Sequence, residues 1–545
     1  MQHTISLLRP SSSALVADTE PVLSVLALND LELDKLCARL AHDNDQAAIL
    51  TGILARMPRD AEVIAYRQAV FDEICRSEGL ADSFNDILRH LRNLEYLTKT
   101  ASTPEELDLW RLFSRFKELG AYVDCIEAIY SRLDAARVKS EGLVALLSNV
   151  GAIRSGDEFS MLREAVCSFD IEIDKIRALS IGINLDSSLN PVEVKLLSIE
   201  EKPYKENPLK AFMQRQITGK TGSFGLDEDL GVRSSTKILS SGRRHSVMSH
   251  LHNDIAFFLR HIIKDADRAL TRLAHIRGGH LIALIPEIEF YLCFAKLRRT
   301  LEGAGLPCCL PRTAKNGAAI KGLYNIGLAL DMLGRGDTPG SLIVPNDAFF
   351  DEECRVMILT GPNRGGKTVY TVALGAAQVL YQTGVCVPAV SAEITPADCV
   401  FTHFPELESK TGDLGRLGEE AGRMCAIFER ATRYSLILLN ESLANTSAME
   451  GMFIALDVVR AFSELGARVV FNTHMHELAE RAQASANCGF DGVVSMTTGI
   501  ENETRTFKVY PGPPLGRSYA EDIARRYGIS YSQLHEALQG KPNIT

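Results

Sequence analysis

The 545-residue sequence has no apolar run that approaches the length of a membrane-spanning helix. Its start, Met1–Ser6, lacks the basic region and the apolar core of a signal peptide. The twelve cysteines are scattered except for Cys308-Cys309, and no Cys-x-x-Cys occurs, which argues for reduced thiols and against a structural zinc site. We therefore expect a cytoplasmic protein without a membrane partner.

The sequence also lacks the net positive charge that is typical of nucleic-acid-binding surfaces, since its formal net charge is −10. Contacts with nucleic acid would then need a local basic patch. Residues 202–245 form a candidate, since this glycine- and serine-containing segment holds nine basic and only four acidic residues. The segment is either a surface that contacts DNA phosphates or a solvated loop whose charges face water. The candidate DNA-contacting residues are Lys220, Arg233, Lys237, Arg243 and Arg244.

The spacing of apolar residues divides the chain into a helical part and a mixed part. Helical spacing runs through residues 29–180 and 251–302, where Pro286 is expected to kink or start the last helix. Glycines and prolines in Gly303–Arg312 mark a boundary. We expect a loose N-terminus at 1–28, a helical domain at 29–310 with a basic glycine-rich insertion at about 190–247, and an α/β domain at 311–545.

Strand and helix patterns alternate in the last part, which predicts a mostly parallel sheet covered by helices. The fold class is therefore multidomain, with a mainly α region followed by an α/β domain. Strands are expected at 356–360, 385–387, 399–402, 436–439 and 469–472. Helices are expected at 366–382, 417–431, 452–465 and 477–482, with two short helices around Tyr527-Gly528.

A phosphate-binding loop is the strongest local signal. The pattern G-x-x-x-x-G-K-[ST] occurs between an apolar strand pattern and a helix pattern, which is the context that such a loop requires. Its backbone N–H groups and the helix start attract phosphate, Lys367 is expected to neutralise the β- and γ-phosphates, and the Thr368 hydroxyl is expected to bind Mg²⁺. The predicted ATP-binding residues are Gly361, Pro362, Asn363, Arg364, Gly365, Gly366, Lys367 and Thr368.

Acidic and amide side chains follow a second buried strand. The apolar run 436–439 ends in Asn440-Glu441, at the strand end where ligands bind in open α/β sheets. Glu441 is suited to orient or deprotonate an attacking water, although a helix-capping or surface acid is the simpler alternative. Asn440 occupies a position where a carboxylate usually steadies Mg²⁺, and its amide oxygen accepts hydrogen bonds without negative charge.

A histidine ends a further strand pattern, Val469–His474. At the carboxyl edge of a sheet, His474 can sense the γ-phosphate and transmit a signal to the next helix. A lone histidine in this place is more often a packed core or cap residue. The neighbouring motifs favour the functional interpretation, so we predict Glu441 and His474 as the catalytic residues.

Four blocks together resemble the MutS-type ATPase. They are Thr360–Thr368, Gly384–Ala389 with Ser391–Glu393, Ser435–Glu441 with Thr446-Ser447 and Gly451, and Asn472–Leu478. The resemblance in order and spacing covers about 340–530, and the helices before 310 resemble the core and lever region of that family. It implies an ABC-like P-loop ATPase that works as a homodimer, with levers and clamps that close around duplex DNA when ATP binds. By position, Thr446 and Ser447 would lie in the dimer-interface loop.

The departures from that family narrow the expectation. The mismatch-reading and connector domains are expected to be absent, and no nuclease-like domain is expected after the ATPase. Phe71–Glu73 matches a short mismatch-wedge pattern, but we interpret Phe71 as a core residue of a helix. The usual aspartate is Asn440, and the serine of an interface loop is replaced near Gly418. These features resemble short MutS-related proteins that do not read mismatches.

The sequence thus predicts a dimeric, DNA-binding ATPase that uses ATP and Mg²⁺, in DNA repair or recombination and with slow hydrolysis. The alternative is a nucleotide-gated scaffold that binds a protein partner and hardly hydrolyses ATP. A chromosome-organising ATPase of the SMC type would need a longer heptad coiled coil than residues 251–302 offer.

Overall fold

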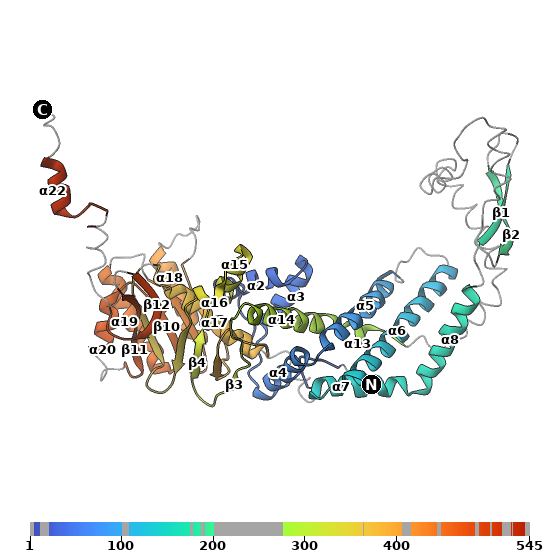
Figure 1. The fold of residues 1–545 in the computed structure, drawn as a ribbon, viewed down its shortest axis with the longest axis horizontal. Helices are drawn as coiled ribbons and strands as arrows, with labels where there is room; N and C mark the ends of the chain where they lie inside the picture. Colours follow the sequence, from blue (N-terminus) through green and yellow to red (C-terminus); the bar gives the residue numbers. More distant parts are fainter. Residues whose placement is uncertain are drawn as a thin grey trace. The chain divides into compact units, whose positions relative to one another are not determined.

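The structure is a computed structural model in which the chain divides into two compact units. Unit 1 contains residues 1–84, 136–146 and 286–545, and unit 2 contains residues 85–135 and 147–285. A mainly helical N-terminal region and an α/β C-terminal region are therefore confirmed (Figure 1). The predicted domain boundaries stay a prediction, since the units group the chain by contacts and not by linear segments. The residues that the structure describes are 5–10, 21–100, 108–174, 178–185, 187, 191–200, 276–362, 364–405, 416–443, 448–484, 490–501, 504–514, 525 and 527–539.

Unit 1 is built on a six-stranded sheet with the order β12-β11-β6-β10-β9-β8. All neighbouring pairs are parallel except β11 and β12, which confirms the mostly parallel sheet. Every residue of β6, β9 and β10 is buried, as expected for strands covered on both faces. The strands are β6 (Val356–Thr360), β8 (Val400–His403), β9 (Leu436–Asn440), β10 (Arg468–Asn472), β11 (Val493–Glu501) and β12 (Thr504–Pro511).

Helices cover both faces of this sheet (Figure 1). Side chains alternate along each strand, so Ile437 and Phe471 join one core cluster with residues of α18, α19 and α20. Leu438 faces the other side, where a Cβ at Gly375 of α17 would lie 2.6 Å from it. The helix is thus packed closely on the sheet. These helices are α17 (Lys367–Gln382), α18 (Arg416–Arg430), α19 (Ala448–Leu465) and α20 (His476–Ala484).

A second sheet of four strands, with the order β3-β7-β4-β5, was not predicted. The predicted strand at 385–387 is wrong, since Val387 forms only an isolated bridge with Cys309. Gly384 turns the chain after α17 at φ +84°, and Pro388 lacks the N–H that a continuing strand needs. The strands are β3 (Arg312–Thr313), β4 (Ala318–Leu323), β5 (Asn346–Phe350) and β7 (Ser391–Ile394), and α15 (Ile326–Arg335) and α16 (Pro339–Leu342) lie between β4 and β5 in the chain.

The N-terminal helices of unit 1 pack with α14 (Ile285–Gly303). The Glu287 carboxylate accepts hydrogen bonds from Ser6 Oγ at 2.7 Å and from Leu7 N at 2.6 Å, and Tyr291 Oη donates to Leu7 O at 2.9 Å. Residues 5–10 are therefore held in place, which corrects the prediction of a loose segment there. Phe71 is fully buried, in agreement with its interpretation as a core residue. The helices are α1 (Val25–Asp30), α2 (Leu33–Leu40), α3 (Asn44–Ala55) and α4 (Ala61–Arg76).

The described part of unit 2 is helical except for one antiparallel pair of strands. Its helices bury apolar rows such as Leu91 and Leu94 of α5 and Ile126 and Ile129 of α6. The helical pattern predicted to 180 ends at Asp174, and an antiparallel pair of strands follows. The basic segment 202–245 and the helix predicted from 251 lie outside the described residues. The elements, of which α5, α6 and α7 share residues with unit 1, are α5 (Leu80–Thr100), α6 (Asp108–Ala136), α7 (Glu141–Arg154), α8 (Asp157–Asp174), β1 (Ala178–Leu185), β2 (Pro191–Glu200) and α13 (Gly279–Ile282).

Two further findings concern the whole described chain. No helix among the described residues is long and apolar enough to cross a membrane. Of the two short helices predicted in the tail, the second is present as α22 (Tyr531–Gln539).

Candidate functional site

The predicted phosphate loop connects β6 to α17. Its backbone has positive φ at Gly361 (+139°), Arg364 (+61°) and Gly366 (+92°), so it curls tightly. A Cβ at Gly361 would lie 2.1 Å from Thr498 Oγ1 on β11, and a Cβ at Gly365 would lie 2.8 Å from the same atom. Glycine is thus required at Gly361 by both conformation and space. Asn363 lies outside the described residues.

Lys367 begins α17 and is only 5% exposed. Its Nζ donates to two carbonyl oxygens of the loop, at 3.1 Å to Gly361 O and 3.3 Å to Pro362 O. Burial lowers the pKa of Lys367, and the negative charge of Glu441 opposes this effect. The ammonium group is therefore held by neutral partners, which an anion can replace.

Two amides and a hydroxyl meet beside the loop. Thr368 Oγ1 donates to Asn440 Oδ1 at 3.1 Å, and Asn472 Nδ2 donates to the same amide oxygen. The two asparagines end neighbouring parallel strands in matched register, which is why they touch. Asn472 Oδ1 is buried and has no hydrogen-bond partner in the described part of the chain. Asn472 begins one of the blocks that resemble MutS, but it was not predicted as a site residue, although two strand patterns that both end in asparagine were a usable signal.

Glu441 directly follows β9 in a left-handed conformation with φ +51°. Its backbone N donates to Asn472 O at 2.8 Å, and its Oε1 lies 2.7 Å from His474 Nε2. Each of these two side chains is 37% exposed. A left-handed conformation costs a residue with a side chain on the order of 1–3 kcal/mol and is concentrated at functional sites. The structure thus brings the two predicted catalytic side chains into direct contact.

The turn after Glu441 is anchored from β8 and α18. His403 Nδ1 lies 2.7 Å from Ser442 Oγ, and that hydroxyl donates to His403 O at 3.1 Å. Leu443 has φ +63°, and its N donates to Glu420 Oε2 at 2.7 Å. Burial, and next the charge of Arg423, lower the pKa of His403. This anchor was not predicted from the sequence.

The remaining residues of the expected dimer interface are placed only in part. Gly418, which the resemblance to the MutS-type ATPase placed near an interface loop, lies in the first turn of α18. Thr446 and Ser447 lie outside the described residues, as do the five candidate DNA-contacting residues in the basic segment.

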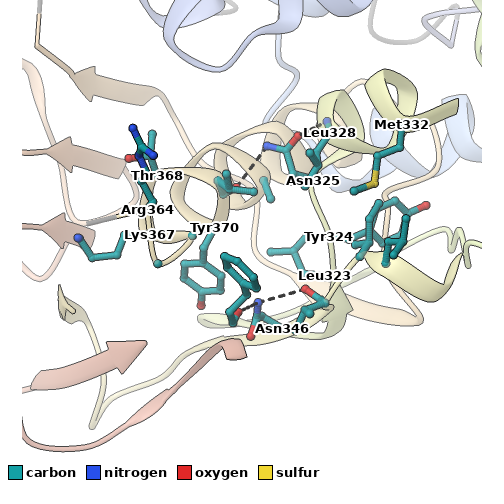
Figure 2. A pocket seen from close by; sticks show the side chains of 18 of the residues that line it. Leu323, Tyr324, Asn325, Leu328, Met332, Asn346, Arg364, Lys367, Thr368 and Tyr370 are labelled. Atoms are coloured by element: carbon teal, nitrogen blue, oxygen red, sulfur yellow. Dashed lines mark hydrogen bonds between the residues drawn. The ribbon is translucent and has the colours of Figure 1, made fainter. Parts of the chain in front are cut away.

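A cavity of about 490 Å³ opens beside the phosphate loop. Figure 2 shows Arg364, Lys367 and Thr368 at one end and Tyr324 and Met332 at the other. The wall between these ends includes Leu323, Leu328, Ile343, Val344, Tyr370 and Phe507. The cavity therefore joins a polar, cationic end to an apolar end.

Phe507 enters this cavity from β12. It is 45% exposed and has φ +57°. Asn346 fixes the strand, because its Nδ2 donates to Phe507 O at 3.0 Å and its Oδ1 accepts from Val509 N at 2.8 Å. The apolar end was not predicted, since its residues come from distant parts of the chain.

Comparison with known proteins identifies the α/β part. Residues 357–539 match the family model of MutS domain V. The chain is related to MutS. A DNA mismatch repair protein MutS of Chlorobium phaeovibrioides is 26% identical over 96% of this chain and 59% of its own length. An Endonuclease MutS2 of Listeria innocua is 33% identical over 36% of this chain and 24% of its own length.

The family resemblance inferred from the sequence is thereby confirmed at the level of a MutS-related chain. A DNA mismatch repair protein MutS of Prochlorococcus marinus is 34% identical over 35% of this chain and 21% of its own length. The MutS-related chain spans about three fifths or less of the length of these curated relatives.

Proposed function

We propose that the protein is an ATPase with an ABC-like P-loop fold. It binds and hydrolyses ATP, and these steps change how the protein binds DNA. The observation that carries this proposal is the convergence of Lys367, Thr368 and Glu441 at one edge of the sheet, beside a cavity of about 490 Å³. Cavities of roughly 300–1,000 Å³ are typical of small-molecule sites. The match to MutS domain V supports the same assignment.

The two ends of the cavity fit the two parts of a nucleotide. The start of α17 offers backbone N–H groups and its dipole to the phosphates, and Lys367 exchanges its bonds with Gly361 O and Pro362 O for phosphate oxygens. The apolar end, with Phe507 and Tyr324 on its wall, suits a planar base. ATP would therefore lie with its triphosphate at the loop and its base at the apolar end.

The donor set beside the loop fits Mg²⁺. Thr368 Oγ1, Asn440 Oδ1 and the unpartnered Asn472 Oδ1 are oxygen atoms, which this cation prefers. When bound, Mg²⁺ would neutralise charge on the phosphates. None of the three oxygens belongs to a carboxylate, so the protein supplies less negative charge than is usual for such a site.

Glu441 is the proposed base for hydrolysis. Its carboxylate orients the attacking water and accepts its proton, while His474 holds that carboxylate through the 2.7 Å contact. His474 would also respond to the γ-phosphate and pass the change to α20, which begins at His476. The anchor formed by His403, Ser442 and Glu420 keeps the turn that carries Glu441 in place.

DNA binding and dimerisation extend the proposal. The relatives that match this chain include proteins named for DNA mismatch repair, and the segment 202–245 has the excess of basic residues that phosphate contacts need. We propose a homodimer in which the loop with Thr446 and Ser447 meets the partner, and a role in repair or recombination without mismatch reading.

ATP turnover with and without duplex or branched DNA tests this function. We expect Lys367→Ala to remove turnover, and Lys315→Ala, at an exposed lysine outside the cavity, to leave it unchanged. Equal turnover in Lys367→Ala and the wild type would exclude the ATPase assignment.

A nucleotide-gated scaffold is the second candidate, and the uncharged donor set around Asn440 favours it. It predicts ATP binding without turnover, both in the wild type and in Asn440→Asp. A rise in turnover in Asn440→Asp would instead indicate an enzyme whose turnover is limited by the amide at position 440.

A further inference from the structure

A second cavity, of about 120 Å³, lies at the amino-terminal ends of the central strands of the six-stranded sheet. The strands β6, β9 and β10 run parallel, and the phosphate loop follows the carboxyl end of β6. Arg355 precedes β6, Tyr434 precedes β9 and Arg468 begins β10, and all three line the second cavity. Arg433 lines it as well. The cavity is therefore distinct from the proposed ATP site and faces the amino ends of the same strands.

Arg468 is a buried cation whose charge lacks a direct partner. It is 5% exposed, its Nη1 donates to Gln378 Oε1 at 3.1 Å, and its Nη2 is buried without a hydrogen-bond partner among the described residues. Among acidic side chains, the charge of Asp398 has the largest effect on the pKa of Arg468, which it raises. That carboxylate already accepts hydrogen bonds from the Thr432 and Ser435 hydroxyls. Buried charges in proteins are normally paired, so this guanidinium is an unusual feature.

The rim of the cavity adds further positive charge. Arg355 Nη1 donates to Gly466 O at 3.2 Å, and the Arg433 guanidinium carbon lies 5.0 Å from the centre of the Tyr434 ring. A fourth cation, Arg59, lies 5.4 Å from the same ring. In the described part of the chain, no ion pair joins Arg355, Arg433 or Arg468 to an acidic side chain.

Two acidic residues also line the cavity, and both are exposed. Asp351 Oδ1 accepts hydrogen bonds from Glu353 N at 2.9 Å and from Cys354 N at 2.8 Å. This carboxylate oxygen therefore stabilises the local turn at residues 351–354. Glu352 is the other. Neither satisfies the buried Nη2 of Arg468.

We propose that this cavity binds a phosphate-sized oxyanion, either inorganic phosphate or the phosphate group of a small monoester. Arg468 Nη2 supplies the buried donor, and Arg355 and Arg433 close around the anion from the rim. Guanidinium groups suit this chemistry, because their planar donors match pairs of phosphate oxygens. A volume of about 120 Å³ holds a phosphate group but not a nucleoside, so the rest of a monoester would lie outside, next to the exposed Tyr434.

The electrostatics of Arg468 agree with an anion at this position. Burial lowers the pKa of its guanidinium to about 10, because the charged form loses hydration. An oxyanion in contact with Nη2 would stabilise the charged form and reverse this effect.

The test measures binding of inorganic phosphate by isothermal titration calorimetry to the full-length Lys367→Ala protein, so that the phosphate loop contributes least. Chloride at equal ionic strength is the reference. We expect one phosphate per chain in Lys367→Ala, and at least tenfold weaker binding when Arg433→Ala or Arg468→Gln is added. Arg335→Ala, at an exposed arginine of α15 outside this cavity, is the matched control and should leave binding unchanged.

Arg433 is exposed, so its variant remains informative if Arg468→Gln fails to fold. Tighter binding of glycerol phosphate than of inorganic phosphate would identify a monoester as the ligand, and the reverse order would identify the free ion. Absence of binding in Lys367→Ala, or unchanged binding in Arg433→Ala, would overturn the proposal. The result does not depend on ATP turnover.

Discussion

Asn440→Asp places a carboxylate where the structure has an amide. The Asn440 side chain is 7% exposed. Its Oδ1 accepts a hydrogen bond from Thr368 Oγ1 at 3.1 Å and another from Asn472 Nδ2. Asp and Asn have nearly the same shape, so both hydrogen bonds can persist with a charged acceptor. The substitution therefore tests charge at the proposed Mg²⁺ position with little change in packing.

The expected magnitude follows from two opposing effects. A carboxylate and the doubly charged Mg²⁺ about 5 Å apart attract by about 7 kcal/mol at an effective dielectric constant near 20. Burial of a carboxylate costs several kcal/mol, on the order of the attraction itself. Two hydrogen bonds to the charged acceptor, at roughly 1.5–3 kcal/mol each, offset much of that cost. We expect a net gain of about 1.4 kcal/mol or more, which corresponds to roughly tenfold tighter Mg²⁺ binding.

The assay is the Mg²⁺ concentration that gives half-maximal ATP binding, followed with a fluorescent ATP analogue, with turnover measured in parallel. Asn44→Asp, an exposed amide in the first turn of α3, controls for the change in net charge. The reasoning is refuted if folded Asn440→Asp and Asn44→Asp require the same Mg²⁺ concentration as the wild type.

Three further outcomes are expected. Glu441→Gln should keep ATP binding and lower turnover by roughly 10²–10⁴-fold, the usual contribution of a general base, as single-turnover kinetics would show; turnover within threefold of the wild type would assign the base to another group. Because burial lowers the folded-state pKa of His403, the unfolded chain binds the proton more readily, so stability should be complete above about pH 6.5 and fall below it. Thermal unfolding from pH 5 to 8 should show a shallower acid loss in His403→Gln, and parallel curves would contradict this. Charge reversal at Arg243 and Arg244 should weaken DNA binding and flatten its dependence on salt, and unchanged binding isotherms would remove that segment from the DNA interface.

The central sheet was predictable because its strands carry strong local signals. Val356–Thr360, Leu436–Asn440 and Arg468–Asn472 are apolar runs that end in polar residues, and such runs indicate strands buried on both faces. The polar residues at their ends then had to converge at one edge of a parallel sheet. This is why Lys367 and Glu441 could be assigned to one site from the sequence.

Other features depend on pairing that no local pattern encodes. The contact of Asn440 with Asn472 follows from the register of β9 and β10. The apolar end of the large cavity combines Tyr324 and Phe507, which are far apart in the chain. The strand predicted at 385–387 failed for the opposite reason: its local pattern is suitable, but Gly384 and Pro388 limit pairing to one bridge.

The discontinuous composition of unit 1 has a consequence for synthesis of the chain. Residues 1–84 share this unit with residues 286–545, and the Ser6–Glu287 bond joins positions 281 residues apart. Translation proceeds at about 5–20 residues per second. The α14 segment, which completes the core of the first helices, is therefore synthesised on the order of ten seconds or more after them. Until then their apolar faces are open to chaperones and to wrong partners. A fragment that starts at residue 311 would lack these helices altogether, so the isolated α/β part should be far less soluble than the whole chain.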